Sequence, residues 1–121
     1  CVLDAIILNP DRHYGNFGVL FDTTTMEILR MAPVFDNNKS LLPELDNDQL
    51  ATPEWYISRC RPRIGRDFII TARGLLREEI RADLERLRDF TFRQHPKIQA
   101  EQVRLDALSA IVRERIRQIL T

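Results

Sequence analysis

The chain has 121 residues, of which 44% are hydrophobic, and its 18 basic residues balance its 18 acidic residues. This size and composition predict one globular domain and exclude global disorder, and the absence of a long apolar run excludes a membrane span. Balanced charge gives no electrostatic reason to expect nucleic acid or a membrane surface as a direct partner. The two distant cysteines, Cys1 and Cys60, form neither a disulfide framework nor a zinc pattern, which favours a reducing, cytoplasmic setting.

The first residues have the character of a buried element. Cys1–Leu8 is short and apolar, so a helix and a buried strand both fit its pattern. Asp4-Ala5 and the following Asn9-Pro10 favour a helix that ends near Leu8, because the residue before a proline avoids helical backbone angles. The chain begins without Met and without a capping residue, so we expect it to be a fragment of a longer protein.

A polar stretch framed by apolar runs follows this element. Asn9–Asn16 is rich in turn-forming residues and is expected to be a loop. Phe17–Phe21 and Met26–Met31 predict the two strands of a β-hairpin. Because a hairpin returns the chain, it should bring Asp36 close to Asn16.

The middle of the chain predicts a loop and then a short helix. Asn37–Ala51 is polar and should be a loop with room for one short helical turn. Thr52 and the proline after it are a helix-start signal, which predicts a helix over Pro53–Arg59 with the Thr52 hydroxyl as its cap. Cys60–Gly65 contains a proline and a glycine and should break that helix.

The remainder is helical by pattern. From Arg66 the chain follows helical spacing, interrupted by Gly74, and an apolar stripe then runs through Leu76, Ile80, Leu84, Leu87 and Phe90. A last helix is predicted over about Gln99–Leu120, packed on this stripe. Its arginines are interspersed with acidic residues, which favours a solvated face over a nucleic-acid surface; they are Arg104, Arg113, Arg115 and Arg117.

These elements predict an α+β fold that is mainly α-helical. We expect a single domain over residues 1–121, in which residues 1–51 carry the polar loop, the hairpin and the Asp36 segment. Residues 52–121 should form a helical subdomain.

The polar loop is the main candidate for chemistry. Its residues are ordinary turn formers and need no catalytic role. However, Asp11 and Asn16 have the spacing of the base Asp and the metal-binding Asn in the protein-kinase catalytic loop. Asp36 follows the hairpin, where kinases place a second metal-binding residue. Arg12 and His13 put cationic or polarisable groups beside the site.

The motif Asp11-Arg12-His13-x-x-Asn16, followed by Ala32-Pro33-Val34-Phe35-Asp36, resembles the C-terminal lobe of HipA-like serine/threonine kinases. These are bacterial proteins known chiefly from toxin–antitoxin modules, and the lead-in to the loop and the helical tail are similar too. The catalytic loop is also similar to that of phosphatidylinositol 3/4-kinases. The resemblance is specific from Leu3 to Asp36.

The resemblance implies a role for each residue of the motif. Asp11 would be the catalytic Asp that orients or deprotonates the acceptor hydroxyl. Asn16 and Asp36 would bind Mg²⁺, a cation that prefers hard oxygen ligands, and Asp36 would hold the ion that bridges the phosphates of ATP. His13 would shape the loop, and Arg12 would contact either a phosphate or an acidic neighbour.

The chain departs from a complete kinase in its nucleotide-binding parts. It has no glycine-rich phosphate loop, and neither Lys39 nor Lys97 precedes Asp11, as the nucleotide-anchoring lysine does in kinases. The resemblance therefore implies an N-terminal lobe elsewhere in the same protein, a protein substrate and an antitoxin partner. We expect the chain alone to be inactive. A non-catalytic helical interaction domain or a pseudokinase remnant is the alternative.

Overall fold

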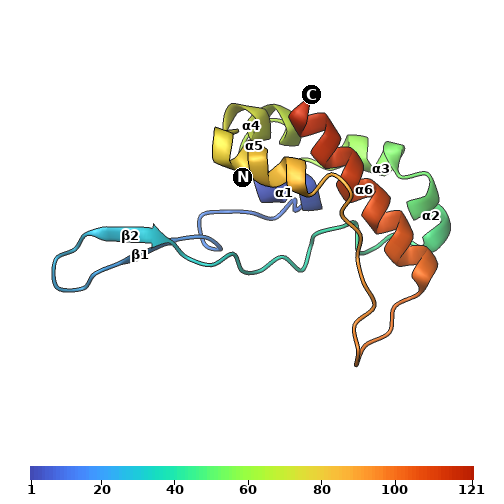
Figure 1. Cartoon of the computed structure of the whole chain (residues 1–121), viewed down its shortest axis with the longest axis horizontal. Helices are drawn as coiled ribbons and strands as arrows, with labels where there is room; N and C mark the ends of the chain where they lie inside the picture. The colour runs from blue at the N-terminus through green and yellow to red at the C-terminus, as the bar shows by residue number, and fades with distance from the viewer.

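The computed structural model describes all 121 residues as an α+β fold with a helical body and one antiparallel hairpin. Figure 1 shows the hairpin projecting to one side of the body, and the segment between the last two helices projects from it as well. The elements are α1 (Val2–Ile7), β1 (Val19–Phe21), β2 (Ile28–Met31), α2 (Asn47–Ala51), α3 (Glu54–Arg59), α4 (Phe68–Gly74), α5 (Glu78–Arg86) and α6 (Gln102–Leu120). None of these helices combines the length and apolar character needed to cross a membrane.

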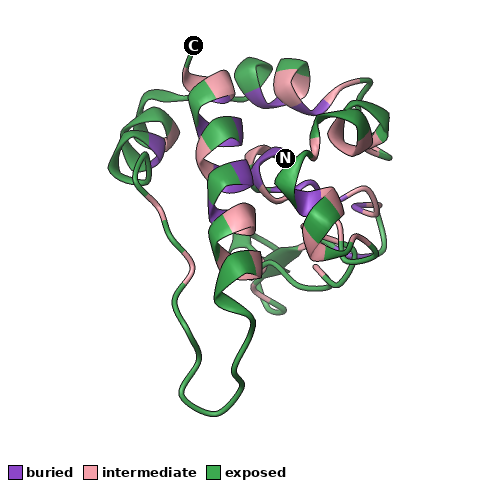
Figure 2. Ribbon diagram, turned by 90° about the vertical axis from the view of Figure 1, so that its right-hand side faces the viewer, coloured by how far each residue is buried: buried purple, intermediate pink, exposed green.

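The last helix is the centre of the body. α6 packs against α1, α2, α4 and α5. Figure 2 shows the buried residues gathered on the inner sides of these helices. The apolar core consists of Ala5, Ile6, Leu8, Leu50, Phe68, Ala72, Leu84, Ile111, Val112, Ile116 and Ile119. The last helix therefore packs on α5, as predicted, and also on three further helices.

The arginines of α6 contact other parts of the protein. Arg104 donates to the Leu45 carbonyl and Arg113 to the Phe90 carbonyl. Arg115 is buried, its Nε donates to the Ala5 carbonyl at 2.8 Å, and burial lowers the pKa of its guanidinium. These bonds fasten loops and α1 to the central helix. The prediction of a solvated face was wrong for Arg115, which is buried against α1.

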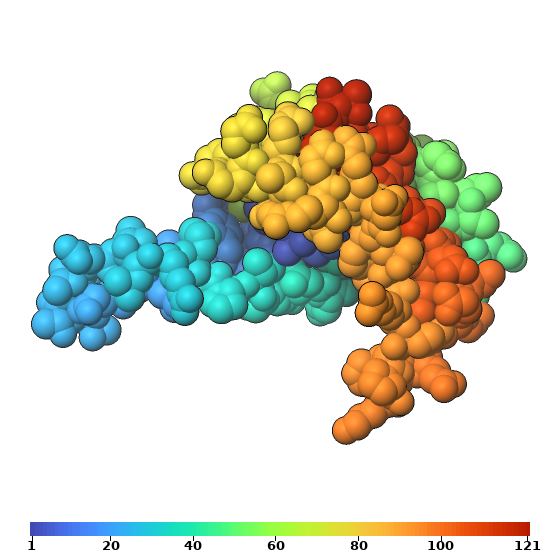
Figure 3. Space-filling model, in the orientation of Figure 1, coloured from blue at the N-terminus to red at the C-terminus, as the bar shows by residue number.

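The first helix and the hairpin are confirmed. α1 ends at Ile7, and Leu8 follows in the left-handed conformation at φ 53°, so the chain turns before Asn9-Pro10. The two strands pair Val19 with Met31 and Leu20 with Arg30, with an irregularity before Phe21. Neither strand contacts a helix. The space-filling view shows the hairpin standing clear of the body (Figure 3).

The two short helices α2 and α3 are also confirmed. α2 provides the expected short turn of helix, and Asp46 caps it by accepting from the Gln49 amide at 2.8 Å. α3 begins at Glu54, but its N-cap is Pro53 and no side chain caps it. The prediction that the Thr52 hydroxyl caps this helix was wrong, because the helix begins one residue later than the capping pattern requires.

The region from Arg66 to Phe90 forms two separate helices, α4 and α5, and not one long helical run. Asp67 caps α4 through the amides of Ile69 and Ile70, and this helix ends at Gly74. α5 then ends at Arg86, so the last positions of the predicted stripe, Leu87 and Phe90, lie beyond it. Beyond α5, Phe92 N–H donates to Ser109 Oγ at 2.9 Å. That bond holds the chain along α6 in place of another helical turn.

Candidate functional site

The polar loop begins with an asparagine that fixes its first turn. Asn9 is buried at the end of α1, and its Oδ1 accepts from the Asp11 amide at 3.0 Å. Its Nδ2 donates to the Asp4 carboxylate. The residue before Pro10 therefore holds the backbone of Asp11 against α1, as asparagine side chains commonly do in tight turns.

Asn16 closes the same loop from the other end. Its side chain is buried, its Oδ1 accepts from the His13 amide at 2.8 Å, and its Nδ2 donates to the Asp11 carbonyl at 2.9 Å. The amide thus bridges both ends of the Asp11-Arg12-His13 segment. A carbonyl oxygen has two lone pairs, so Oδ1 keeps one that these contacts do not use.

His13 shapes the tip of the loop. Its Nδ1 accepts from the Gly15 amide at 3.0 Å. A Cβ at Gly15 would lie 2.9 Å from His13 Cε1, closer than carbon atoms pack, so the glycine is needed for this approach. In this arrangement the imidazole acts on the backbone of its own loop.

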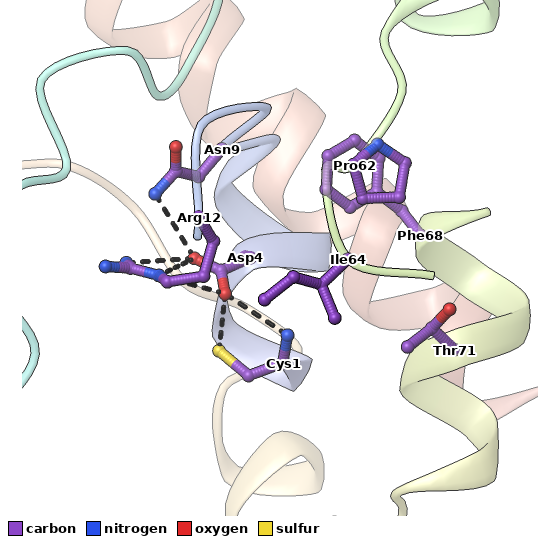
Figure 4. A pocket seen from close by; sticks show the side chains of 8 residues that line it. All are labelled: Cys1, Asp4, Asn9, Arg12, Pro62, Ile64, Phe68 and Thr71. Carbon is purple, nitrogen blue, oxygen red and sulfur yellow. Dashed lines mark hydrogen bonds and ion pairs between the residues drawn. The ribbon is translucent and has the colours of Figure 1, made fainter. Parts of the chain in front are cut away.

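Arg12 is the buried hub of the site. Its guanidinium pairs with the buried Asp4 carboxylate at 3.0 Å, and Asp4 also accepts from Cys1 Sγ and Asn9 Nδ2 (Figure 4). From the sequence, Arg12 could contact either a phosphate or an acidic neighbour. In the structure it contacts an acidic neighbour, Asp4. Buried charges are tolerated only when they are paired and hydrogen-bonded, and these two are.

The same guanidinium holds the Asp36 segment beside the loop. Arg12 Nη1 donates to the carbonyls of Asn16 and Phe35, both at 2.8 Å, and Nη2 donates to Asn37 Oδ1 at 2.5 Å. Because one nitrogen serves both carbonyls, the two ends of the hairpin meet at Arg12. The expected approach of the Asp36 segment to Asn16 therefore occurs through an arginine.

Asp36 itself is left free by these contacts. It is exposed, makes no hydrogen bond or ion pair, and has a left-handed backbone at φ 56°. Few residue types other than glycine adopt this conformation, and aspartate is one of them. Residues held in such conformations cluster at functional sites, where neighbouring contacts keep them in place.

Asp11 lies at the surface next to an arginine from the connection between α3 and α4. Arg63 Nη1 contacts Asp11 Oδ1 at 3.0 Å, and the two side chains are 57% and 38% exposed. An ion pair this exposed contributes about 1 kcal/mol at most, because water and salt screen it. The carboxylate of Asp11 can therefore exchange this partner for another at small cost.

Other groups near the loop have structural roles. The space between Asp4, Arg12 and the α3–α4 connection is a cavity of about 10 Å³, which has no room for a ligand (Figure 4). The Cys60 thiol lies 4.0 Å from the Leu8 carbonyl oxygen, and burial raises the pKa of this thiol. A raised pKa keeps sulfur in its less reactive neutral form.

The arrangement offers two accessible carboxylates, Asp11 and Asp36, on segments joined by Arg12. Carboxylates of this kind can accept a proton from a hydroxyl or ligate a hard cation. No group of three or more His, Cys, Asp and Glu side chains is arranged so that it could hold a metal ion.

Three residues of the site were missed from the sequence. Asp4 could have been noticed, because a lone acidic residue in an apolar run needs a buried partner. Asn9 was predicted as a turn residue before a proline, but the contacts of its side chain with Asp4 and Asp11 were not predicted. Arg63 is separated from Asp11 by 52 residues, and no local pattern indicates their contact.

Comparison with known proteins identified no relative. No family model matches the chain, and no curated protein or solved structure matches it.

Proposed function

We propose that the chain is the catalytic-loop lobe of an ATP- and Mg²⁺-dependent serine/threonine kinase of the HipA-like type. The observation that carries this proposal is the buried Arg12 clamp, which keeps the Asp11 loop and the Asp36 segment together. Phosphoryl transfer depends on such positioning, because little covalent chemistry falls to the protein.

Each residue of the loop has a role in this proposal. Asp11 orients the acceptor hydroxyl of a protein substrate and accepts its proton. Asp36, whose carboxylate has no protein partner, would hold the metal together with Asn16, whose buried Oδ1 keeps one unused lone pair. When bound, Mg²⁺ neutralises the charge that develops on the phosphates of ATP.

The proposal includes an N-terminal lobe of the same protein that supplies the nucleotide-binding groups. The chain has no glycine-rich loop and no lysine ahead of Asp11. Without those groups the chain alone should show no measurable turnover. An antitoxin partner and a cytoplasmic location belong to the same proposal.

The test uses the full-length protein and a phosphotransfer assay. Asp11→Asn and Asp36→Asn should each lower the rate by about 100-fold or more, because each removes a carboxylate that acts in the transfer. Asp48→Asn, at an exposed position of α2, is the matched control and should keep full activity. If both Asp11→Asn and Asp36→Asn keep activity and circular dichroism shows them folded, the catalytic assignment is wrong.

One observation favours a second function, a non-catalytic interaction domain or pseudokinase remnant. Large apolar side chains are exposed on both strands of the hairpin, among them Phe21, Ile28 and Met31. Exposed apolar patches on a soluble domain mark surfaces that bind other proteins. In that case the full-length protein would show no phosphotransfer, and the Asp11 and Asp36 variants would bind its partner as the parent does.

A further inference from the structure

The connection between α3 and α4 presents arginines on one side. Residues 60–67 contain three arginines and one acidic residue, Asp67, whose side chain caps α4, although the whole chain is balanced. Burial alternates along this connection: Cys60, Pro62 and Ile64 are half-buried, whereas Arg61 and Arg63 are exposed. Arg61 and Arg63, which flank Pro62, therefore both face solvent.

The inward side of this connection fixes it to the candidate site. Pro62 and Ile64 line the small cavity that Asp4 and Arg12 line from the other side (Figure 4). These contacts fix the position of the connection relative to the Asp11 loop. Its outward arginine, Arg63, reaches the Asp11 carboxylate.

A second pair of cations lies beside Pro10. Lys39 and Arg59 line a hollow of about 240 Å³ together with Pro10, and Glu44 is the only acidic residue in its lining. The Arg59 guanidinium lies 4.4 Å from the centroid of the Trp55 ring, which restrains the side chain. Neither Lys39 nor Arg59 forms an ion pair. Lys39 and Arg59 beside Pro10, together with Arg63 beside Asp11, are called the cationic rim below.

We propose that this cationic rim binds an acidic segment of the protein acceptor, with carboxylates beside the hydroxyl that is phosphorylated. The inference rests on the proposed kinase function and adds its acceptor class. Arginine binds carboxylates through paired hydrogen bonds, so Arg63 can leave Asp11 for a carboxylate of the acceptor. Arrival of an acidic acceptor would then free Asp11 to receive the hydroxyl proton.

Charge favours a peptide over a nucleic acid as the occupant. Nucleic-acid surfaces carry a broad basic field, whereas this chain has no net charge and its rim is bordered by Glu44. Three cations in one small area can pair with the few carboxylates of a short acidic peptide.

Binding can be measured without turnover. The probe is a fluorescein-labelled peptide with one serine among aspartates and glutamates, and fluorescence anisotropy with the full-length protein gives its affinity. The triple variant Lys39→Gln, Arg59→Gln and Arg63→Gln should weaken binding by roughly tenfold or more, and added salt should weaken the parent's binding. A peptide with lysines in place of the acidic residues should bind poorly.

The matched control removes three positive charges elsewhere. Arg86→Gln, Arg93→Gln and Lys97→Gln lie at exposed positions at the end of α5 and beyond it. This control should bind the acidic peptide as the parent does. The proposal is overturned if the acidic peptide does not bind, if both triple variants lose the same affinity, or if a single-stranded RNA oligonucleotide binds the rim more tightly than the peptide.

A kinetic measurement separates this proposal from the kinase assignment. Arg63→Gln should raise KM for the acidic peptide several-fold more than KM for a neutral serine peptide, because only the acidic peptide loses a carboxylate contact with the arginine. Equal rises of KM for both peptides would contradict the rim. Specific peptide binding without any phosphotransfer would retain the rim and reject the kinase.

Discussion

Arg12 contacts three separate segments of the chain from a buried position. Its partners are Asp4 in α1, the Asn16 carbonyl at the start of the hairpin, and Phe35 and Asn37 at its end. A lysine could not make these contacts, because they use several nitrogens of a planar fork. The Asp4–Arg12 pair is therefore the contact whose loss should affect the candidate site most.

Removing one partner of the Asp4–Arg12 pair should be strongly destabilising. Arg12→Leu or Asp4→Leu leaves an unpaired buried charge, which costs about 3–5 kcal/mol. The double variant should cost about 0.5–3 kcal/mol less than the sum of the two single losses, because it removes both charges. Urea unfolding of the four proteins measures this coupling. Strictly additive losses would mean that the pair has no energetic connection.

An exposed ion pair of the same chain provides the comparison. Glu85 and Arg88 pair on the surface at the end of α5. Arg88→Leu should change stability by no more than about 1 kcal/mol, since exposed pairs are screened by water. Burial, and not charge pairing as such, would then explain the large effect at Arg12.

The connection between α3 and α4 depends on one glycine. Gly65 has φ +87°, and a Cβ there would lie 2.5 Å from Thr71 Oγ1. Gly74, in the last turn of α4, has open space around it. The same substitution should therefore have opposite effects at these two positions.

Gly65→Ala should lower the free energy of unfolding by at least about 1 kcal/mol, from the left-handed backbone and the collision with Thr71. Gly74→Ala should raise it by about 0.5–1 kcal/mol, because alanine is the better helix former. Thermal or urea unfolding of both variants checks this. The geometry of the connection would be contradicted if Gly65→Ala were as stable as Gly74→Ala.

Local patterns in the sequence predicted most elements but not where the helices after Arg66 end. The end of α1 and the hairpin follow from Asn9-Pro10 and from short apolar runs around a turn. The stripe from Leu76 to Phe90 suggested a longer helix than α5, because Leu87 and Phe90 keep helical spacing after the helix has ended. Phe90 packs against the core and its carbonyl accepts from Arg113 of α6, a contact between distant residues, whereas Leu87 is exposed.

The candidate site was predictable to a similar extent. The loop and the return of Asp36 follow from local sequence. The partners that hold them, Asp4 for Arg12 and Arg63 for Asp11, depend on how the whole chain folds. Local periodicity carries no information on such pairs.

Across the whole molecule, three carboxyl groups have a pKa that the fold lowers. Backbone N–H groups of Thr25 and Thr24 lower the pKa of Asp22 in the hairpin turn. Hydrogen bonds from arginines lower the pKa of Glu85 and of Glu114, through Arg88 and Arg117. All three lie at or near the surface, so each contribution is small.

The pH dependence follows from these lowered pKa values. A carboxyl whose pKa is lower in the folded state stabilises the fold above its ordinary pKa of about 4, and this stabilisation is lost as pH falls through the folded value. The free energy of unfolding should therefore decline between about pH 5 and about pH 2. Urea unfolding over that range measures it. Glu114→Gln should flatten the decline, and an unchanged slope would remove Glu114 from this account.

The hairpin has a topological property that follows from the shared nitrogen of Arg12. Residues 17–34 leave the helical body after Asn16 and return to it at Phe35. The carbonyls of Asn16 and Phe35 accept from the same nitrogen of Arg12. The excursion can therefore lengthen, shorten or change its sequence without altering the separation of the two carboxylate-bearing segments.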